Sequence, residues 1–294
     1  MVDWRKWKIQ EVSRNDKDFP VELKKIKSCP EKLYFRGEWN NDLFKKTITI
    51  VGSRRMTRYG RDIVAKFVPD LVASKITVIS GFMYGVDTAA HSECLECGGK
   101  TIAVVGGGLD MMNRFYNEAL YSAILDKGGL VISEYPSDFK PTVWSFPQRD
   151  RIMSALSTAG VLVVEGGIKS GSLITANFAM KQSKKVLAVP GPINSSVSAG
   201  PNWLIKSGVA KMVTEVADIL GDGLARPEQQ GLFKDYSDLS TLEKKIVSVL
   251  ETEAVTIDEL CRNIRTGVTE TSTAISMMLM RGLIEEENGK FYLA

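Results

Sequence analysis

The segment Thr47-Ile48-Thr49-Ile50-Val51-Gly52 decides the fold, because five β-branched residues follow one another without alternation and stop at a glycine. A continuous run of this kind is typical of a strand buried on both faces, as in a parallel sheet. Five more apolar runs have the same form, at 76–80, 101–105, 130–133, 161–165 and 185–189. Helix-length segments separate them, at roughly 59–74, 84–97, 116–127, 149–157 and 172–183. This alternation predicts an α/β fold with a doubly wound, mostly parallel sheet and helices on both faces.

The rest of the chain divides into three parts. Residues 1–44 are rich in charge and interrupted by Phe19-Pro20 and Cys29-Pro30, so we expect an N-terminal extension that packs on the core domain, residues 45–220. Residues 221–236 have the glycine, proline and glutamine content of a linker. Residues 237–294 contain three helical patterns and then two short strands joined at Asn288-Gly289, which predicts a small C-terminal winged-helix domain.

The charge balance is not that of a strongly basic nucleic-acid-binding protein. The 294 residues include 38 Lys and Arg against 35 Asp and Glu, a net charge of +3, so any basic surface must be local. Residues 237–294 carry six basic and ten acidic residues, a net charge of −4, which leaves +7 for residues 1–236. A winged helix that reads DNA needs basic groups on its recognition helix and wing. We therefore interpret the acidic domain as a protein-contact or regulatory module.

Several other classes of protein do not fit the sequence. No apolar run reaches the roughly 18 to 20 residues of a membrane span, and residues 1–7 lack the apolar core of a signal peptide, so we expect a cytoplasmic protein without a membrane partner. Four cysteines in such a chain do not suggest a disulfide framework. Cys94 and Cys97, with His91 nearby, have no second pair of ligands beside them, so no metal is expected.

Glycine-bearing loops follow five of the six predicted strands. In open parallel sheets, ligands bind beyond the carboxyl ends of the strands, and glycines let backbone N–H groups approach an anion closely. Ser170-Gly171-Ser172 also precedes a helix, whose free N–H groups and positive dipole end favour phosphate. One such loop alone would only turn the chain, but five together with two cations predict an anion site. Its candidate residues are Gly52, Ser53, Arg54, Gly106, Lys169, Ser170, Gly171 and Ser172.

The sequence motifs of common nucleotide and serine-hydrolase sites are absent from these loops. The nicotinamide fingerprint G-x-G-x-x-G is broken because Met111 stands where the third glycine belongs. No G-x-x-x-x-G-K-S/T loop for a nucleoside triphosphate is present. A serine hydrolase lacks support, since His91 is the single histidine and no G-x-S-x-G elbow exists. We therefore expect no cofactor.

A second candidate segment combines aromatic and basic side chains. Trp144 and Phe146 lie a few residues before Arg149, Asp150 and Arg151. Single-stranded nucleic acids bind to such combinations, because cations hold the phosphates and aromatic rings stack on the bases, at about 1–3 kcal/mol per base. The segment alone could equally be a helix start with a buried phenylalanine, but beside an anion-binding edge it favours binding.

Several ordered motifs resemble the DNA-processing protein family known as DprA or Smf. They are collinear over about residues 45–220. They comprise Gly52-Ser53-Arg54, Ser80-Gly81 with Gly85-Val86-Asp87 and His91, residues 99–110 (GKTIAVVGGGLD), Ser133-Glu134-Tyr135-Pro136, residues 146–151 (FPQRDR), residues 169–176 (KSGSLITA), and Pro190-Gly191 with residues 200–205 (GPNWLI).

The resemblance implies a Rossmann-like, non-enzymatic domain that binds single-stranded DNA. It further implies a homodimer that protects incoming DNA and loads the RecA recombinase in natural transformation and recombination. By motif match, the DNA pocket would be lined by Arg54, Phe146, Arg149, Arg151, Lys169, Ser170, Gly171 and Ser172, with Lys206 beside them. Residues 203–220 are the suggested dimer interface.

Asp150 is one of the departures from the family pattern, as is Asn113-Arg114 in place of the family's Tyr-Pro, and two other functions stay open. Asp150 stands where the family usually has Asn, so a negative charge lies near the expected phosphates unless it pairs with Arg149 or Arg151. An alternative is a nucleoside-monophosphate-cleaving enzyme on a related scaffold, with Glu165 as its catalytic acid. Another is a nucleotide-sensing module that signals through the winged helix.

Overall fold

The computed structural model describes residues 6–111, 117–221, 239–250, 254–287 and 289–293. The chain divides into two compact units, and the boundary falls after Leu224. The expected linker, residues 221–236, lies outside the described residues from 222 onward. None of the described helices is long and apolar enough to cross a bilayer.

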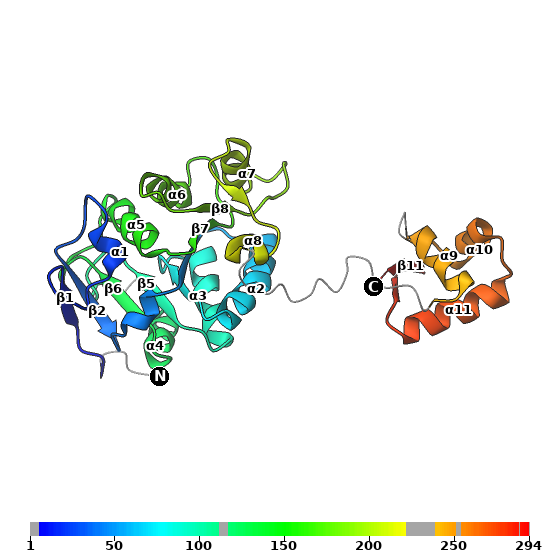
Figure 1. Ribbon diagram of the computed structural model, residues 1–294, viewed down its shortest axis with the longest axis horizontal. Helices are drawn as coiled ribbons and strands as arrows, with labels where there is room; N and C mark the ends of the chain where they lie inside the picture. The colour runs from blue at the N-terminus through cyan, green and yellow to red at the C-terminus, as the bar shows by residue number, and fades with distance from the viewer. Residues whose placement is uncertain (1–5, 112–116, 222–238, 251–253, 288, 294) are drawn as a thin grey trace. The chain divides into compact units, whose positions relative to one another are not determined.

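The first unit is built on one nine-stranded sheet (Figure 1), in the order β1-β2-β6-β5-β4-β3-β7-β8-β9. All neighbours from β6 to β9 are parallel, and β2 pairs antiparallel with both β1 and β6. The predicted doubly wound, mostly parallel α/β sheet is therefore confirmed. The strands are β1 (Gln10–Ser13), β2 (Lys32–Gly37), β3 (Thr47–Val51), β4 (Thr77–Ser80), β5 (Thr101–Val104), β6 (Leu130–Ser133), β7 (Gly160–Val163), β8 (Val186–Ala188) and β9 (Lys211–Met212).

Helices cover both faces of this sheet. One face carries α1 (Val21–Lys24), α5 (Ser145–Leu156), α6 (Gly171–Lys181) and α7 (Ala199–Lys206). The other carries α2 (Arg58–Ala73), α3 (Val86–Glu96), α4 (Glu118–Asp126) and α8 (Ala217–Leu220). Successive strand residues point to opposite faces, so Val78 packs in one core cluster and Ile79 in another. Continuous apolar runs, rather than alternating ones, satisfy both faces.

The N-terminal segment contributes more than the expected packing. Its two strands, β1 and β2, extend the sheet beside β6, and a 3₁₀ turn at Asn41–Phe44 leads into β3. Leu23 and Leu33 of this segment are fully buried in the core.

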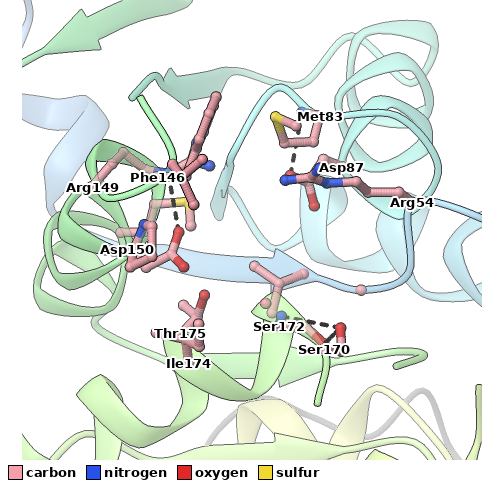
Figure 2. A pocket seen from close by; sticks show the side chains of 16 residues that line it. Arg54, Met83, Asp87, Phe146, Arg149, Asp150, Ser170, Ser172, Ile174 and Thr175 are labelled. Carbon is pink, nitrogen blue, oxygen red and sulfur yellow. Dashed lines mark hydrogen bonds and ion pairs between the residues drawn. The ribbon is translucent and has the colours of Figure 1, made fainter. Parts of the chain in front are cut away.

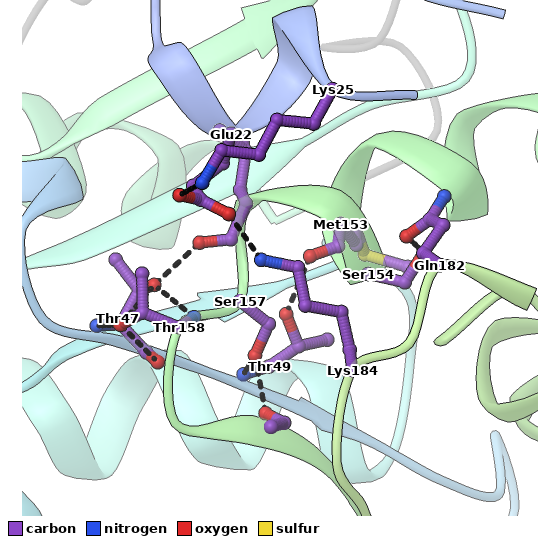
Figure 3. Close-up of polar contacts among 12 residues, drawn as sticks. Glu22, Lys25, Thr47, Thr49, Met153, Ser154, Ser157, Thr158, Gln182 and Lys184 are labelled. Carbon is purple, nitrogen blue, oxygen red and sulfur yellow. Dashed lines mark hydrogen bonds and ion pairs between the residues drawn. The ribbon is translucent and has the colours of Figure 1, made fainter. Parts of the chain in front are cut away.

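The threonines of β3 form hydrogen bonds that hold α5 against the sheet. Thr49 Oγ1 donates to the carbonyl of Met153 at 2.9 Å, and Thr47 Oγ1 donates to that of Leu156 at 2.5 Å (Figure 3). The last carbonyls of a helix have no partner within it, so these buried hydroxyls satisfy them. Thr49 N donates in turn to Ser157 Oγ at 3.0 Å. This network positions α5, which carries much of the candidate site.

The described residues of the second unit form three helices followed by an antiparallel hairpin. The elements are α9 (Thr241–Leu250), α10 (Ile257–Ile264), α11 (Val268–Met280), β10 (Ile284–Glu287) and β11 (Lys290–Leu293). Thr256 and Glu259 form a capping box at the start of α10. Asn288, in the predicted turn of the hairpin, lies outside the described residues.

Candidate functional site

A pocket of about 480 Å³ opens at the carboxyl ends of the parallel strands. It lies where the strand order reverses, between β3 and β7, and open α/β sheets bind their ligands at this point. Predicted site residues that line it are Gly52, Arg54, Phe146, Arg149, Asp150, Ser170, Gly171 and Ser172. The fold thus brings together the loop after β3, the first turns of α5 and the start of α6 (Figure 2).

The loop after β3 packs tightly against the start of α3. Val86 N donates to Ser53 O at 3.2 Å. Gly85 has a φ of +76°, and a Cβ there would lie 2.2 Å from Ser53 O, so this position requires glycine. Ser53 Oγ accepts from Arg55 N at 3.0 Å and therefore stabilises the loop instead of lining the pocket. Because the backbone is held this way, Arg54 is left exposed at the mouth of the pocket.

Arg54 and Phe146 face each other across that mouth. The guanidinium carbon of Arg54 lies 5.9 Å from the centroid of the Phe146 ring, within cation–π range. Phe146 is partly exposed, so it is not the buried core residue that a plain helix start would explain. Gly106 lies beneath it: a Cβ on Gly106 would be 3.0 Å from the ring. Gly106 therefore supports the aromatic ring and does not itself line the pocket.

The guanidinium of Arg149 is buried and forms hydrogen bonds to other groups of the protein. It is 4% exposed, and its Nη1 donates to Gly81 O at 2.6 Å and also to Val104 O. Its Nε donates to Asp150 Oδ1 at 3.1 Å, which is the ion pair anticipated from the unusual aspartate. Gly81 must be glycine for this approach, because a Cβ would lie 2.6 Å from Nη1. The guanidinium forms part of the pocket wall while bonding the ends of β4 and β5.

Arg151 does not line the pocket, contrary to the prediction from its motif. Two residues along a helix rotate a side chain by about 200°, so Arg149 and Arg151 leave α5 in opposite directions. Arg151 is 8% exposed and forms a bidentate ion pair with Glu134, at 3.0 and 2.5 Å. Its guanidinium belongs to a different part of the surface, where it lines another pocket.

Ser170 caps α6, the helix that the sequence predicts beside Ser170-Gly171-Ser172. Its side chain accepts from Ser172 N at 3.3 Å, and the two hydroxyl oxygens lie 2.8 Å apart. Gly171 is exposed at the first helical position, so the positive end of the helix dipole opens into the pocket. Lys169 is exposed next to this cap and Lys206 is exposed at the end of α7, but neither side chain lines the pocket.

Two buried carboxyl groups make the pocket wall less positive than expected. Burial raises the pKa of Asp87 and of Asp150 to about 6, against the attraction of Arg149, which lowers both. Two guanidinium groups and two carboxyl groups therefore line the pocket, and their charges cancel at neutral pH. Asp87 was not predicted as a site residue, although the loop Gly85-Val86-Asp87 after β4 placed it at the right edge.

Glu165 is placed where a catalytic acid would be ineffective. It is 1% exposed and does not line the pocket. Its carboxylate accepts from Thr57 N at 2.9 Å and from the Thr57 hydroxyl, at the N-cap of α2. This carboxylate thus anchors the start of a helix, which gives no support to the nucleoside-monophosphate-cleaving alternative.

His91 and the cysteines do not form a metal site within the described residues, where no cluster of three or more His, Cys, Asp or Glu side chains occurs. His91 is fully buried, and its Nδ1 lies 2.6 Å from Thr101 Oγ1. Burial lowers its pKa to about 3, so the ring is neutral at physiological pH.

The fold and the pocket define a doubly wound α/β protein with a pocket at the switch point of its sheet, lined by two arginines, two aspartates and the start of α6. Residues 10–223 match the model of the family described as DNA recombination-mediator protein A, and the chain belongs to this family. Protein Smf of Escherichia coli K12 is 34% identical over 280 residues, which cover 93% of this chain and 74% of that protein.

Two solved structures are similar to the chain. That of DNA processing protein A (DprA) from Streptococcus pneumoniae is 39% identical with a TM-score of 0.66, covering 73% of this chain and 74% of its own. That of DprA from Helicobacter pylori is 28% identical with a TM-score of 0.64, covering 73% and 94% respectively. The latter work concerns the single-stranded DNA binding mode of the Helicobacter protein.

Proposed function

We propose that this protein binds single-stranded DNA in the switch-point pocket. The observation that carries the proposal is the pair formed by Arg54 and Phe146, an exposed cation and a partly exposed ring 5.9 Å apart, beside the N-terminal end of α6. A base can stack on the ring while a phosphate meets the guanidinium and the helix end. Lys169 at the rim adds a further exposed cation.

The same proposal assigns different roles to the two arginines of α5. Arg149 shapes the pocket from within the wall, and Arg151 acts elsewhere on the surface. Asp150 is compatible with a polyanion because its charge is paired with Arg149. Gly52, Ser170, Gly171 and Ser172 supply the close backbone and hydroxyl surface for a phosphate.

We further propose that the protein is a non-enzymatic mediator that protects incoming DNA and loads the RecA recombinase during transformation and recombination, as membership of the family suggests. It would act in the cytoplasm as a homodimer through residues 203–220. Trp203 and Met212 in this segment are 50% and 49% exposed, which gives it apolar surface to bury. The acidic C-terminal module would contact a protein partner. Faster RecA nucleation on coated single strands in the presence of this protein tests the mediator role.

The binding site is tested by comparing two arginine variants on fluorescent oligo-dT. Arg54→Ala should weaken binding at least tenfold, because it removes a phosphate contact and the cation beside Phe146. Arg58→Ala is the matched control: its side chain is 95% exposed, four residues further on, and does not line the pocket. Equal affinity of both variants would refute the assignment of the pocket.

A further inference from the structure

A second pocket, of about 600 Å³, opens at the C-terminal end of α6. It is lined by residues of the N-terminal extension, by Arg151 of α5 and by the chain from Phe178 to Lys184. Lys184 lies two residues before the start of β8, so this pocket lies toward the amino ends of the parallel strands. It is therefore at the opposite edge of the sheet from the switch-point pocket.

The charge of this pocket differs from that of the switch-point pocket. Five cationic side chains line it against a single carboxylate, a net charge of +4. They are Lys25, Lys27, Arg151, Lys181 and Lys184, with Glu22 as the acid. The charges lining the switch-point pocket cancel, so the second pocket has the larger excess of positive charge.

Some of these cations are already paired within the protein. Glu22 accepts from Lys25 at 2.6 Å and also from Lys184 (Figure 3). Burial acts to raise the pKa of Glu22, but these two hydrogen bonds hold it below its ordinary value. Lys27 and Lys181 are exposed and form no ion pair with any described residue. Two cations are thus available to a ligand.

Arg151, in the same wall, keeps one donor without a partner in the described part of the chain. Its Nη atoms are taken by Glu134, but its buried Nε has no hydrogen-bond partner among the described residues. Phe178 lines the pocket and is partly exposed. Sites that bind single-stranded nucleic acids combine an aromatic ring with cations in this way.

One face of α6 connects the two pockets. Gly171, Ile174, Phe178 and Lys181 are spaced by three or four residues, so they lie along one stripe of the helix. The first two line the switch-point pocket and the last two line the second pocket. Ten residues of helix span about 15 Å, so a strand of more than about four nucleotides is needed to place phosphates in both pockets.

We propose that the second pocket is a phosphate subsite that holds the backbone of a single-stranded nucleic acid continuing along α6 from the switch-point pocket. Lys27 and Lys181 contact the phosphates, and Phe178 offers its ring to a base. This inference rests on the proposed function of the switch-point pocket, and it adds a longer footprint than that pocket alone would give.

The test compares a short and a long oligonucleotide on the full-length protein. The variant is Lys27→Ala/Lys181→Ala, and the control is Lys8→Ala/Lys66→Ala, two exposed lysines that line neither pocket. The probes are dT4, which is too short to reach both pockets, and dT20, each titrated from 0.05 to 0.3 M salt. Losing two phosphate contacts should lower the salt slope on dT20 by about 1.4 and its affinity at 0.1 M by about 25-fold. Affinity for dT4 should stay within about twofold, because its phosphates remain at the switch-point pocket.

The outcomes separate this inference from the proposed function. If wild-type protein bound neither oligonucleotide, the proposed function would fail. If dT20 bound to the test variant as tightly as to the control, or if dT4 and dT20 lost affinity equally, the second subsite would be overturned. Loss of inorganic phosphate binding without loss on dT20 would also overturn it, since the site would then take a free anion.

Discussion

Replacing Arg149 with Met tests whether this arginine stabilises the fold or contacts DNA. The substitution keeps the volume of the side chain but removes the donors to Gly81 O and Val104 O, and it leaves Asp150 buried without its ion pair. Breaking a buried pair by removing one partner costs about 3–5 kcal/mol, in part because the remaining charge is uncompensated. Such a loss is large against the roughly 5–15 kcal/mol of total stability typical of a domain.

The assay is urea unfolding followed by tryptophan fluorescence. All five tryptophans lie in the first compact unit, so the signal reports that unit alone. Adding Asp150→Asn to the Arg149→Met variant should recover about 1–2 kcal/mol, because a neutral amide replaces the uncompensated charge. If Arg149→Met unfolded within about 1 kcal/mol of wild type while losing oligo-dT binding, Arg149 would be a DNA ligand and the structural role would be refuted.

Three further predictions concern the remaining site residues. Phe146→Ala should weaken oligo-dT binding by the energy of one stacked base, about 1–3 kcal/mol, and an unchanged dissociation constant in fluorescence anisotropy would contradict stacking. The pKa values of Asp87 and Asp150, about 6, lie above the ordinary 3.8, so both groups lose their charge as the pH falls from 7 to 5 and DNA binding should strengthen, by roughly 1 kcal/mol per neutralised carboxylate. Asp150→Asn should reduce that pH dependence, and an identical pH profile would count against the assignment. Glu165→Gln should cost about 1–2 kcal/mol of stability in urea unfolding through its contacts to Thr57 without changing DNA binding, whereas a base-release activity lost in this variant would restore the enzyme alternative.

Sequence patterns were sufficient to predict the strands at the centre of the sheet. All six predicted strands are present, because buried parallel strands need continuous apolar residues and this signal is local. Strands β1 and β2 were missed, since they are short, partly exposed and pair antiparallel at the edge, where no continuous run is required. The start of α5 was placed four residues too late, because Trp144 at its N-cap is not a capping residue type.

The site was predicted well where the backbone forms it and less well where long side chains do. Loops at strand ends meet at one edge by topology, so Gly52, Arg54 and the start of α6 could be assigned together. The partners of Arg149 and Arg151 come from segments far away in the chain, and no local pattern reveals Gly81 O or Glu134. Burial and pairing, which decide whether an arginine meets solvent or protein, depend on that tertiary context.

The most direct test of the central claim is a titration of dT20 and of a 20-base-pair duplex across salt concentrations. A pocket that places a ring beside a cation accepts an unstacked base, which a duplex does not offer. We expect the single strand to bind about 100-fold more tightly than the duplex at physiological salt, and Arg54→Ala to remove most of this difference. Equal affinity for the two forms, or selectivity that survives Arg54→Ala, would contradict it.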